Sequence, residues 1–188
     1  MEQGKIHTFI EEGIGWIKFY HPKGNSLPSV LLNEIARAIH LYDKDASVRV
    51  IAIASEGASA FCAGASFDEL LSIKNESEGK NFFSGFAKVI LAMKESSKFI
   101  VARIHGKAIG GGVGIAAAAD YSFALNTASI KLSELSLGIG PFVIGPAVER
   151  KIGLAAFSEL SINATEWKSA QWAHQKGLFT SIHDSEEL

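Results

Sequence analysis

Two short, almost continuous apolar runs constrain the fold more than any other feature of the sequence. Residues 49–55 and 99–104 are rich in valine, isoleucine and alanine, and each has the length of a single strand. Such runs are typical of strands buried on both faces, which occur in parallel sheets covered by helices. Segments with helical spacing of apolar residues lie between them. The sequence therefore predicts an α/β domain with parallel strand pairing.

Further elements fit this alternation. Residues 5–10 and 14–20 are predicted to form a hairpin with a turn at 11–13, and residues 73–80 are polar enough to form a surface loop. Helices are expected where apolar residues recur at spacings of three and four or where a cap precedes them. The expected helices are one capped by Ser29, one that begins at the capping box Ser66–Glu69, those over residues 82–93 and 113–119, and one capped by Thr165 that stops at Gly177.

Composition restricts the class of protein. A chain of 188 residues is expected to form one domain over residues 1–188, and a net charge of −2 disfavours non-specific binding to nucleic acid or an anionic membrane. The single cysteine excludes an internal disulfide framework, and the six histidines show no metal spacing. Residues 1–12 lack the apolar core of a signal peptide, and residues 109–119 are too short to span a bilayer. We therefore expect a cytoplasmic protein.

The densest motif lies at residues 105–114, where five glycines precede a predicted helix. Without side chains the backbone can approach a ligand closely, and the N–H groups of the helix start favour an anion or oxyanion. Close packing of the helix on the sheet is the alternative interpretation. The run fails as a phosphate-binding loop of the Walker type, because Ala108 stands where Ser or Thr is needed. A dinucleotide fingerprint at residues 112–117 is a weak match, because residues 107–111 separate it from the strand.

Two other segments could contribute to a site. Ala63, Gly64 and Ala65 precede the capped helix and could gather free backbone N–H groups there, although an ordinary loop would look the same. Cys62 is interpreted as a small packing residue. Glu134 is flanked by leucine and isoleucine residues, and desolvation there would raise its pKa toward the range of a general acid or base. An exposed acid on an alternating strand is the equally open alternative.

In their order, these segments resemble the enoyl-CoA hydratase/isomerase (crotonase) family across almost the whole chain. The matching stretches are residues 22–27, 61–67, 104–112 with 116–120, 133–138 and 169–178. The resemblance implies a crotonase-like spiral of ββα turns that binds an acyl-CoA thioester. It implies no cofactor beyond the coenzyme A of the substrate, and no nucleic-acid or membrane partner.

The resemblance also implies a set of site residues. The backbone N–H groups of Ala65 and Gly111 would form an oxyanion hole for the thioester enolate, with Glu134 as the acid/base. The substrate and CoA would contact further residues, which are Lys23 as a candidate for the phosphates, Cys62, Ala63, Gly64, Gly110 and Gly114.

One departure from the family pattern affects the mechanism. Hydratases of the family commonly carry two glutamates, and Gly114 stands at the position of the first. A single carboxylate favours an isomerase-type proton shuttle on a 3-enoyl-CoA over hydration of a 2-enoyl-CoA. Hydration stays open if Asp68, Glu69 or an ordered water assists. A CoA-thioester-binding module without catalytic activity is the alternative from another class.

A second departure concerns the C-terminus. Family members usually continue for several helices, and these are expected to be missing or truncated here. If such helices are present, the family pattern predicts a homo-oligomer, either a trimer or a hexamer.

Overall fold

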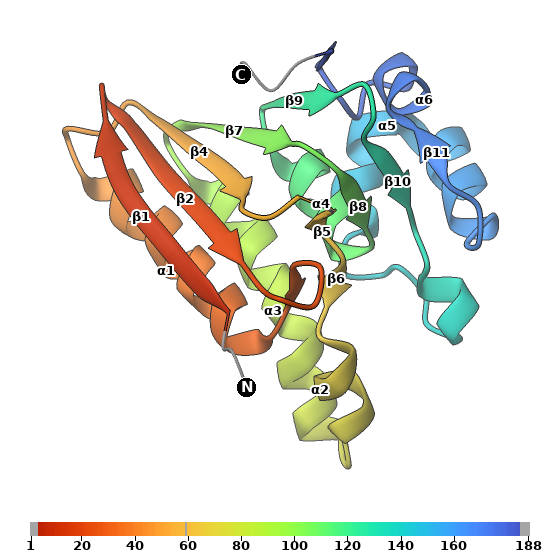
Figure 1. Ribbon diagram of the computed structural model, residues 1–188. Helices are drawn as coiled ribbons and strands as arrows, with labels where there is room; N and C mark the ends of the chain where they lie inside the picture. Colours follow the sequence, from red (N-terminus) through yellow and green to blue (C-terminus); the bar gives the residue numbers. More distant parts are fainter. Residues whose placement is uncertain (1–3, 59, 185–188) are drawn as a thin grey trace.

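The computed structural model describes residues 4–58 and 60–184, so Ser59 and the ends of the predicted 1–188 domain lie outside it. Within these ranges the chain forms two main sheets and a short strand pair (Figure 1). The six-stranded sheet has the order β1 (Lys5–Glu11), β2 (Ile14–Tyr20), β4 (Val50–Ser55), β7 (Phe99–Ile104), β9 (Tyr121–Leu125) and β12 (Ser181–His183). The four-stranded sheet has the order β11 (Lys168–Ser169), β10 (Ser129–Lys131), β8 (Lys107–Ile109) and β5 (Ala60–Cys62). The pair is β3 (Ser26–Leu27) with β6 (Gly64–Ala65).

The strand pairing in the six-stranded sheet agrees with the pairing predicted from the sequence. The β1–β2 hairpin is antiparallel, as predicted, and β2, β4, β7, β9 and β12 are joined by parallel pairing. The two apolar runs are the central strands β4 and β7, with Ile51, Ile53, Ile100 and Ile104 fully buried. Burial on both faces explains why these runs do not alternate with polar residues.

The chain repeats one unit of two strands and a helix. Each unit sends a strand to the six-stranded sheet and the next strand to the four-stranded sheet, and then continues into a helix. The three full repeats are β4–β5 with α3 (Glu76–Glu95), β7–β8 with α4 (Gly111–Ala118), and β9–β10 with α5 (Gly145–Ile162). Equivalent strands of successive repeats pair in parallel. The predicted spiral of ββα turns is thus confirmed.

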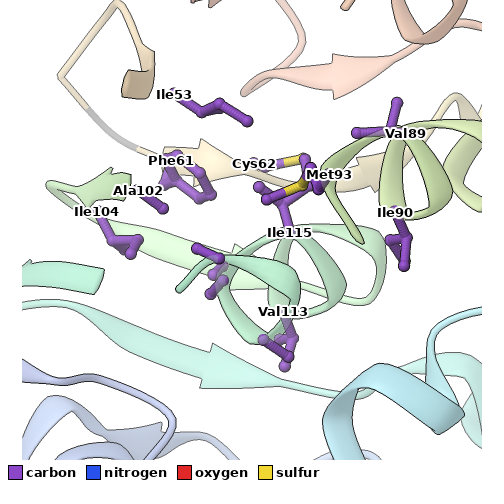
Figure 2. Close-up of a cluster of buried hydrophobic side chains, with 14 of the residues drawn as sticks. Ile53, Phe61, Cys62, Val89, Ile90, Met93, Ala102, Ile104, Val113 and Ile115 are labelled. Carbon is purple, nitrogen blue, oxygen red and sulfur yellow. The ribbon is translucent and has the colours of Figure 1, made fainter. Parts of the chain in front are cut away.

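The core lies between the sheets and the helices, and Figure 2 shows part of it. Met93 of α3, Ile115 of α4 and Cys62 of β5 belong to one buried cluster (Figure 2). α1 (Ser29–Lys44) and α3 pack against each other behind the six-stranded sheet in Figure 1. None of the helices in the described ranges combines the length and the apolar character that a membrane-spanning helix requires.

The predicted Ser29 cap is wrong, because the cap comes from another helix. Ser29 is the first helical residue of α1, and Pro28 before it makes no side-chain cap. The carboxylate of Glu69, in α2 (Phe67–Ser72), accepts from the Ser29 N–H at 2.9 Å and from its hydroxyl at 2.8 Å. The helix start of α2 is as predicted, with Ser66 accepting from the Glu69 N–H. The Glu69 side chain therefore caps α1 instead of completing its own capping box.

Two further expectations need correction, and one helix was missed. The predicted 73–80 loop is cut short because Asn75 caps α3 by accepting from the Glu78 N–H, so that helix begins at Glu76. The last helix, α6 (Ala170–Gln175), is capped by Ser169 instead of Thr165, because a short strand intervenes. The sequence analysis also missed α5, which is interrupted by non-helical backbone at Gly153.

Candidate active site

Three successive turns of the spiral bring the candidate residues to one corner. Ala65 lies three residues after β5, Gly111 two residues after β8, and Glu134 three residues after β10. These strands are parallel neighbours, so their carboxyl ends emerge at one edge about 4.8 Å apart. The crevice at the carboxyl ends of parallel strands is where open α/β sheets bind ligands. Ala65 and Glu134, which are 69 positions apart in sequence, therefore line one cavity.

The loop at 63–65 and the glycine turn at 110–111 touch. A Cβ atom on Gly64 would lie 3.2 Å from the Ile109 carbonyl oxygen and 3.8 Å from the Gly111 nitrogen. Gly111 is the first residue of α4, so its N–H belongs to the group that lacks an acceptor within the helix. The helix start thus adds positive potential at this corner.

Gly110 is required both by its backbone and by its neighbour. Its φ of +52° is a conformation that side chains rarely adopt. A Cβ atom at Gly110 would also lie 2.7 Å from Oε1 of Glu134. The turn is fixed to the next strand by a 3.0 Å hydrogen bond from the Gly110 N–H to the Lys131 carbonyl. Only glycine at position 110 therefore lets the turn and the Glu134 carboxylate lie this close together.

The other glycines of the cluster serve packing. A Cβ atom at Gly112 would lie 2.6 Å from the Cys62 carbonyl oxygen, and one at Gly114 would lie 2.6 Å from Cγ2 of Ile144. Both glycines are buried, and neither is among the described residues that line the cavity. Both interpretations of the motif therefore apply, each to one part of it. Gly110 and Gly111 lie at the cavity, as expected for a ligand site, whereas Gly112 and Gly114 allow close packing of the helix.

Glu134 is a partly buried acid without full compensation. It begins a 3₁₀ turn, η1 (Glu134–Leu137), that ends at Gly138 in the left-handed conformation. Burial raises the pKa of the Glu134 carboxyl above 4.5, and a hydrogen bond from its own backbone N–H offsets part of this rise. Its Oε2 is buried without a hydrogen-bond partner in the described part of the chain. These are the properties of a group suited to exchanging a proton.

The cavity has a volume of about 130 Å³ and is lined almost entirely by apolar groups. The lining combines the loop and turn residues already described with residues of α2 and α3. Among the described lining residues, Glu134 is the only ionisable one and Ser133 the only other polar side chain. The apolar side chains of the wall are those of Leu70, Phe82, Phe83, Phe86, Ile109, Leu137, Ile139, Pro141, Val143 and Ile144.

The remaining predicted site residues lie away from the cavity lining. Ala63, Gly64, Ala65, Gly110, Gly111 and Glu134 line the cavity, whereas Cys62, Lys23 and Gly114 do not. Cys62 is fully buried, and burial raises the pKa of its thiol to about 12, which agrees with a packing role. Lys23 lies on an exposed loop and forms an ion pair with Asp68.

Neither of the two other acids considered from the sequence approaches Glu134. The carboxylate of Asp68 pairs with Lys23, and that of Glu69 is held by Ser29. Both side chains are absent from the described cavity lining. No group of three or more potential metal-ligating side chains was found in residues 4–58 and 60–184.

Sequence reasoning missed the roles of Phe86 and Ile144. A Cβ atom at Gly111 would lie 2.3 Å from a ring carbon of Phe86, so this ring packs directly under the glycine turn. Helical spacing had marked Phe86 only as a core residue. No signal in the sequence separates a core residue from one that also lines a site, because both are apolar.

The architecture and the corner site define an α/β spiral of the crotonase type, and comparisons with known proteins agree. A family profile described as "Enoyl-CoA hydratase/isomerase" matches residues 9–188. The chain belongs to this family.

Relatives and solved structures show the extent of the likeness. A Bacillus subtilis protein described as a probable enoyl-CoA hydratase is 32% identical over 174 residues, which cover 92% of this chain and 67% of the relative. A short-chain-enoyl-CoA hydratase from Clostridium acetobutylicum is 28% identical over 100% of this chain and 72% of its own length. The crystal structure of an enoyl-CoA hydratase from Bacillus anthracis superposes with a TM-score of 0.88 at 28% identity, covering 95% of this chain and 69% of that one. The chain thus spans about two thirds of these proteins.

Proposed function

We propose that this chain acts on an enoyl-CoA thioester and moves a proton with a single carboxylate, Glu134. The observation that carries the proposal is that Glu134 is the only ionisable side chain among the described residues of an apolar cavity. Isomerisation of a 3-enoyl to a 2-enoyl thioester needs one group that removes a proton from C2 and returns it at C4. A partly buried carboxyl with a raised pKa suits both directions of transfer.

The proposed oxyanion hole consists of the backbone N–H groups of Ala65 and Gly111. Two donors fixed in advance stabilise the charge on the thioester oxygen as the dienolate forms. The contact between the loop at 63–65 and the glycine turn supports this pairing. We place the CoA portion along Ala63 and Gly64, with Lys23 as the candidate for its phosphates. The reaction uses no cofactor besides the CoA of the substrate.

The proton shuttle conserves atoms and charge. Ionised Glu134 takes a proton from C2 of the 3-enoyl thioester, and the electron pair is delocalised to the thioester oxygen as a dienolate. The protonated carboxyl then donates the same proton at C4. The double bond moves into conjugation, and the carboxylate is restored for the next turnover.

Hydration of a 2-enoyl thioester is the second candidate, because two of the relatives described above are named enoyl-CoA hydratases. Addition of water needs one group to activate water and a proton source for C2, which two carboxylates share well. Here the neighbourhood of Gly114 is filled by Ile144 and Ile90, so the position offers no space for a second acid. The presence of only one carboxylate in the described lining is what favours the proton shuttle.

Matched assays distinguish the candidates. The chain is incubated with a 3-enoyl-CoA and, separately, with the 2-enoyl-CoA of the same length, and products are separated by chromatography. We expect kcat/KM for isomerisation to exceed that for hydration. Faster hydration would select the second candidate. Calorimetric binding of CoA without turnover of either thioester would instead identify a binding module.

The pH dependence of isomerisation is expected to follow the raised pKa of Glu134. The base must be ionised, so kcat/KM should fall as the pH decreases through that pKa, at a midpoint above 4.5. The measurement is a pH profile of kcat/KM on a 3-enoyl thioester. An acid limb at or below 4.5 would contradict the assignment.

Stability should depend on pH in the opposite direction. Because the pKa of Glu134 is higher in the folded than in the unfolded chain, its contribution to stability is complete at low pH and is lost as the pH rises through the folded value. The Glu134→Gln variant is therefore expected to have the higher Tm at pH 8, with the difference shrinking toward pH 4.5. Thermal unfolding of the unaltered chain and of the variant at each pH measures this difference in Tm.

Restoring a second carboxylate should require space as well as charge. A Cβ atom at position 114 would lie 2.6 Å from Cγ2 of Ile144. We expect Gly114→Glu alone to lose about 1–3 kcal/mol of stability through overpacking and to gain no hydration. Combined with Ile144→Gly, it should raise the ratio of hydration to isomerisation at least about tenfold.

Thermal unfolding and the two thioester assays measure both effects, and Ile144→Gly alone is the control. Equal hydration by the single variant Gly114→Glu and the double variant would show that Ile144 does not exclude the second acid.

A further inference from the structure

We infer that the acyl group of the substrate is a hydrocarbon along its whole length and carries no carboxylate at its far end. This inference rests on the proposed function, because it concerns the same cavity. It identifies the class of thioester that the cavity selects, beyond the reaction that Glu134 performs.

The first argument is the chemistry of the wall. Besides the glycine turn and Glu134, the lining includes the rings of Phe82, Phe83 and Phe86 and the side chains of Ile139, Val143 and Ile144. None of the described lining residues is a lysine, arginine or histidine. A carboxylate at the end of an acyl chain that enters this cavity would lose its water without gaining an ion pair.

The second argument is the charge of the base. Glu134 must be ionised to remove the proton, and its pKa is already raised by burial. A second carboxylate in the same small, apolar cavity would disfavour that ionised form further, since like charges in one site raise each other's pKa. A dicarboxylic acyl group would therefore bind more weakly, and it would also lower the fraction of Glu134 that is ionised.

Lys23, the cation proposed to bind the substrate, does not neutralise such a carboxylate. Lys23 lies outside the described lining and pairs with Asp68 on an exposed loop. Its proposed partner is the phosphate end of CoA, at the opposite end of the ligand from the acyl terminus. A terminal carboxylate would thus remain without a counter-charge.

A matched pair of substrates tests the inference. Hex-3-enoyl-CoA and the monothioester of hex-3-enedioic acid have the same chain length and double bond, and differ by a terminal methyl against a carboxylate. A hydrophobic pocket rejects an added hydroxyl by about 10²-fold, and a charge is harder to bury. We therefore expect kcat/KM for the dicarboxylic substrate to be at least about 100-fold lower. A difference below tenfold would overturn the inference.

A variant with an added positive charge tests directly whether the cavity wall sets the preference. Phe83 lines the cavity and is 39% exposed, so an arginine can be accommodated there at its mouth. Phe83→Arg should narrow the preference for the hydrocarbon substrate at least about tenfold. Leu91→Arg, on the same helix but outside the described lining, carries the same charge and should leave the preference unchanged. Equal effects of the two variants would contradict a role for the cavity wall.

Binding keeps this test separate from that of the reaction. With Glu134→Gln, calorimetry measures the Kd of both thioesters without turnover and without the charge at position 134. We expect the dicarboxylic thioester to bind at least about tenfold more weakly. If neither thioester is turned over by the unaltered chain but this ratio is found, the proposed isomerisation fails and the inference stands. If the two Kd values are equal, the inference fails whatever the activity.

Discussion

Replacing Glu134 with glutamine is expected to lower kcat for isomerisation by about 10²–10⁴-fold, the usual contribution of a positioned acid/base. Glutamine keeps the size of the side chain but neither accepts nor returns the proton. The only other polar side chain in the described lining is that of Ser133, and its hydroxyl is a far weaker base. The loss should therefore appear with every 3-enoyl thioester tested.

The measurement is steady-state turnover, accompanied by binding and stability controls. Calorimetric affinity for CoA should change less than threefold, because the carboxylate lies at the acyl end. Glu166→Gln is the matched control, since Glu166 is a surface carboxylate that pairs with Lys168. It should retain full activity. Unchanged turnover of both 3-enoyl and 2-enoyl thioesters by Glu134→Gln would show that Glu134 is not the acid/base.

Replacing Gly111 with alanine is expected to produce the second large loss. The new Cβ atom would lie 2.3 Å from a ring carbon of Phe86, so either the ring or the helix start must move. If the Gly111 N–H moves, one donor of the proposed oxyanion hole is lost, and such a loss typically lowers kcat by about 10²–10³-fold. Overpacking should also lower stability by about 1–3 kcal/mol.

Gly79→Ala provides the matched control for this variant. Gly79 lies within α3, and a Cβ atom there would meet only Cγ2 of Ile73 at an ordinary 3.7 Å. It should keep full activity and gain about 0.5–1 kcal/mol of stability from the better helix propensity of alanine. Turnover and thermal unfolding of both variants are compared. An active Gly111→Ala variant would remove Gly111 from the oxyanion hole.

Much of the fold could be predicted because the deciding signals are local. The apolar runs at β4 and β7, the periodicity of α1 and α3 and the glycine cluster before α4 depend on neighbours within a few residues. The errors occurred where a distant group replaced a local one. Ser29 resembles a cap in the sequence, but the carboxylate of Glu69, 40 residues away, performs that function.

The candidate site was less predictable, because its residues have ambiguous side chains. Glycine clusters indicate either close packing or a ligand, and here Gly110 and Gly112 differ in this respect although they are two residues apart. Glu134 was equally compatible with an exposed strand. Only its position after β10, beside the glycine turn, distinguishes the alternatives.

The sequence by itself determined the alternation of strands and helices, the positions of the glycine turns and the presence of one acid among apolar neighbours. These properties follow from residue type and spacing, which act over a few residues. Only the tertiary structure decided that three loops meet at one corner, that Ile144 fills the space beside Gly114, and that Glu134 is the one ionisable residue in the described cavity lining. The physical reason is that burial and contact are set by strand register between repeats, which no single segment of the chain contains.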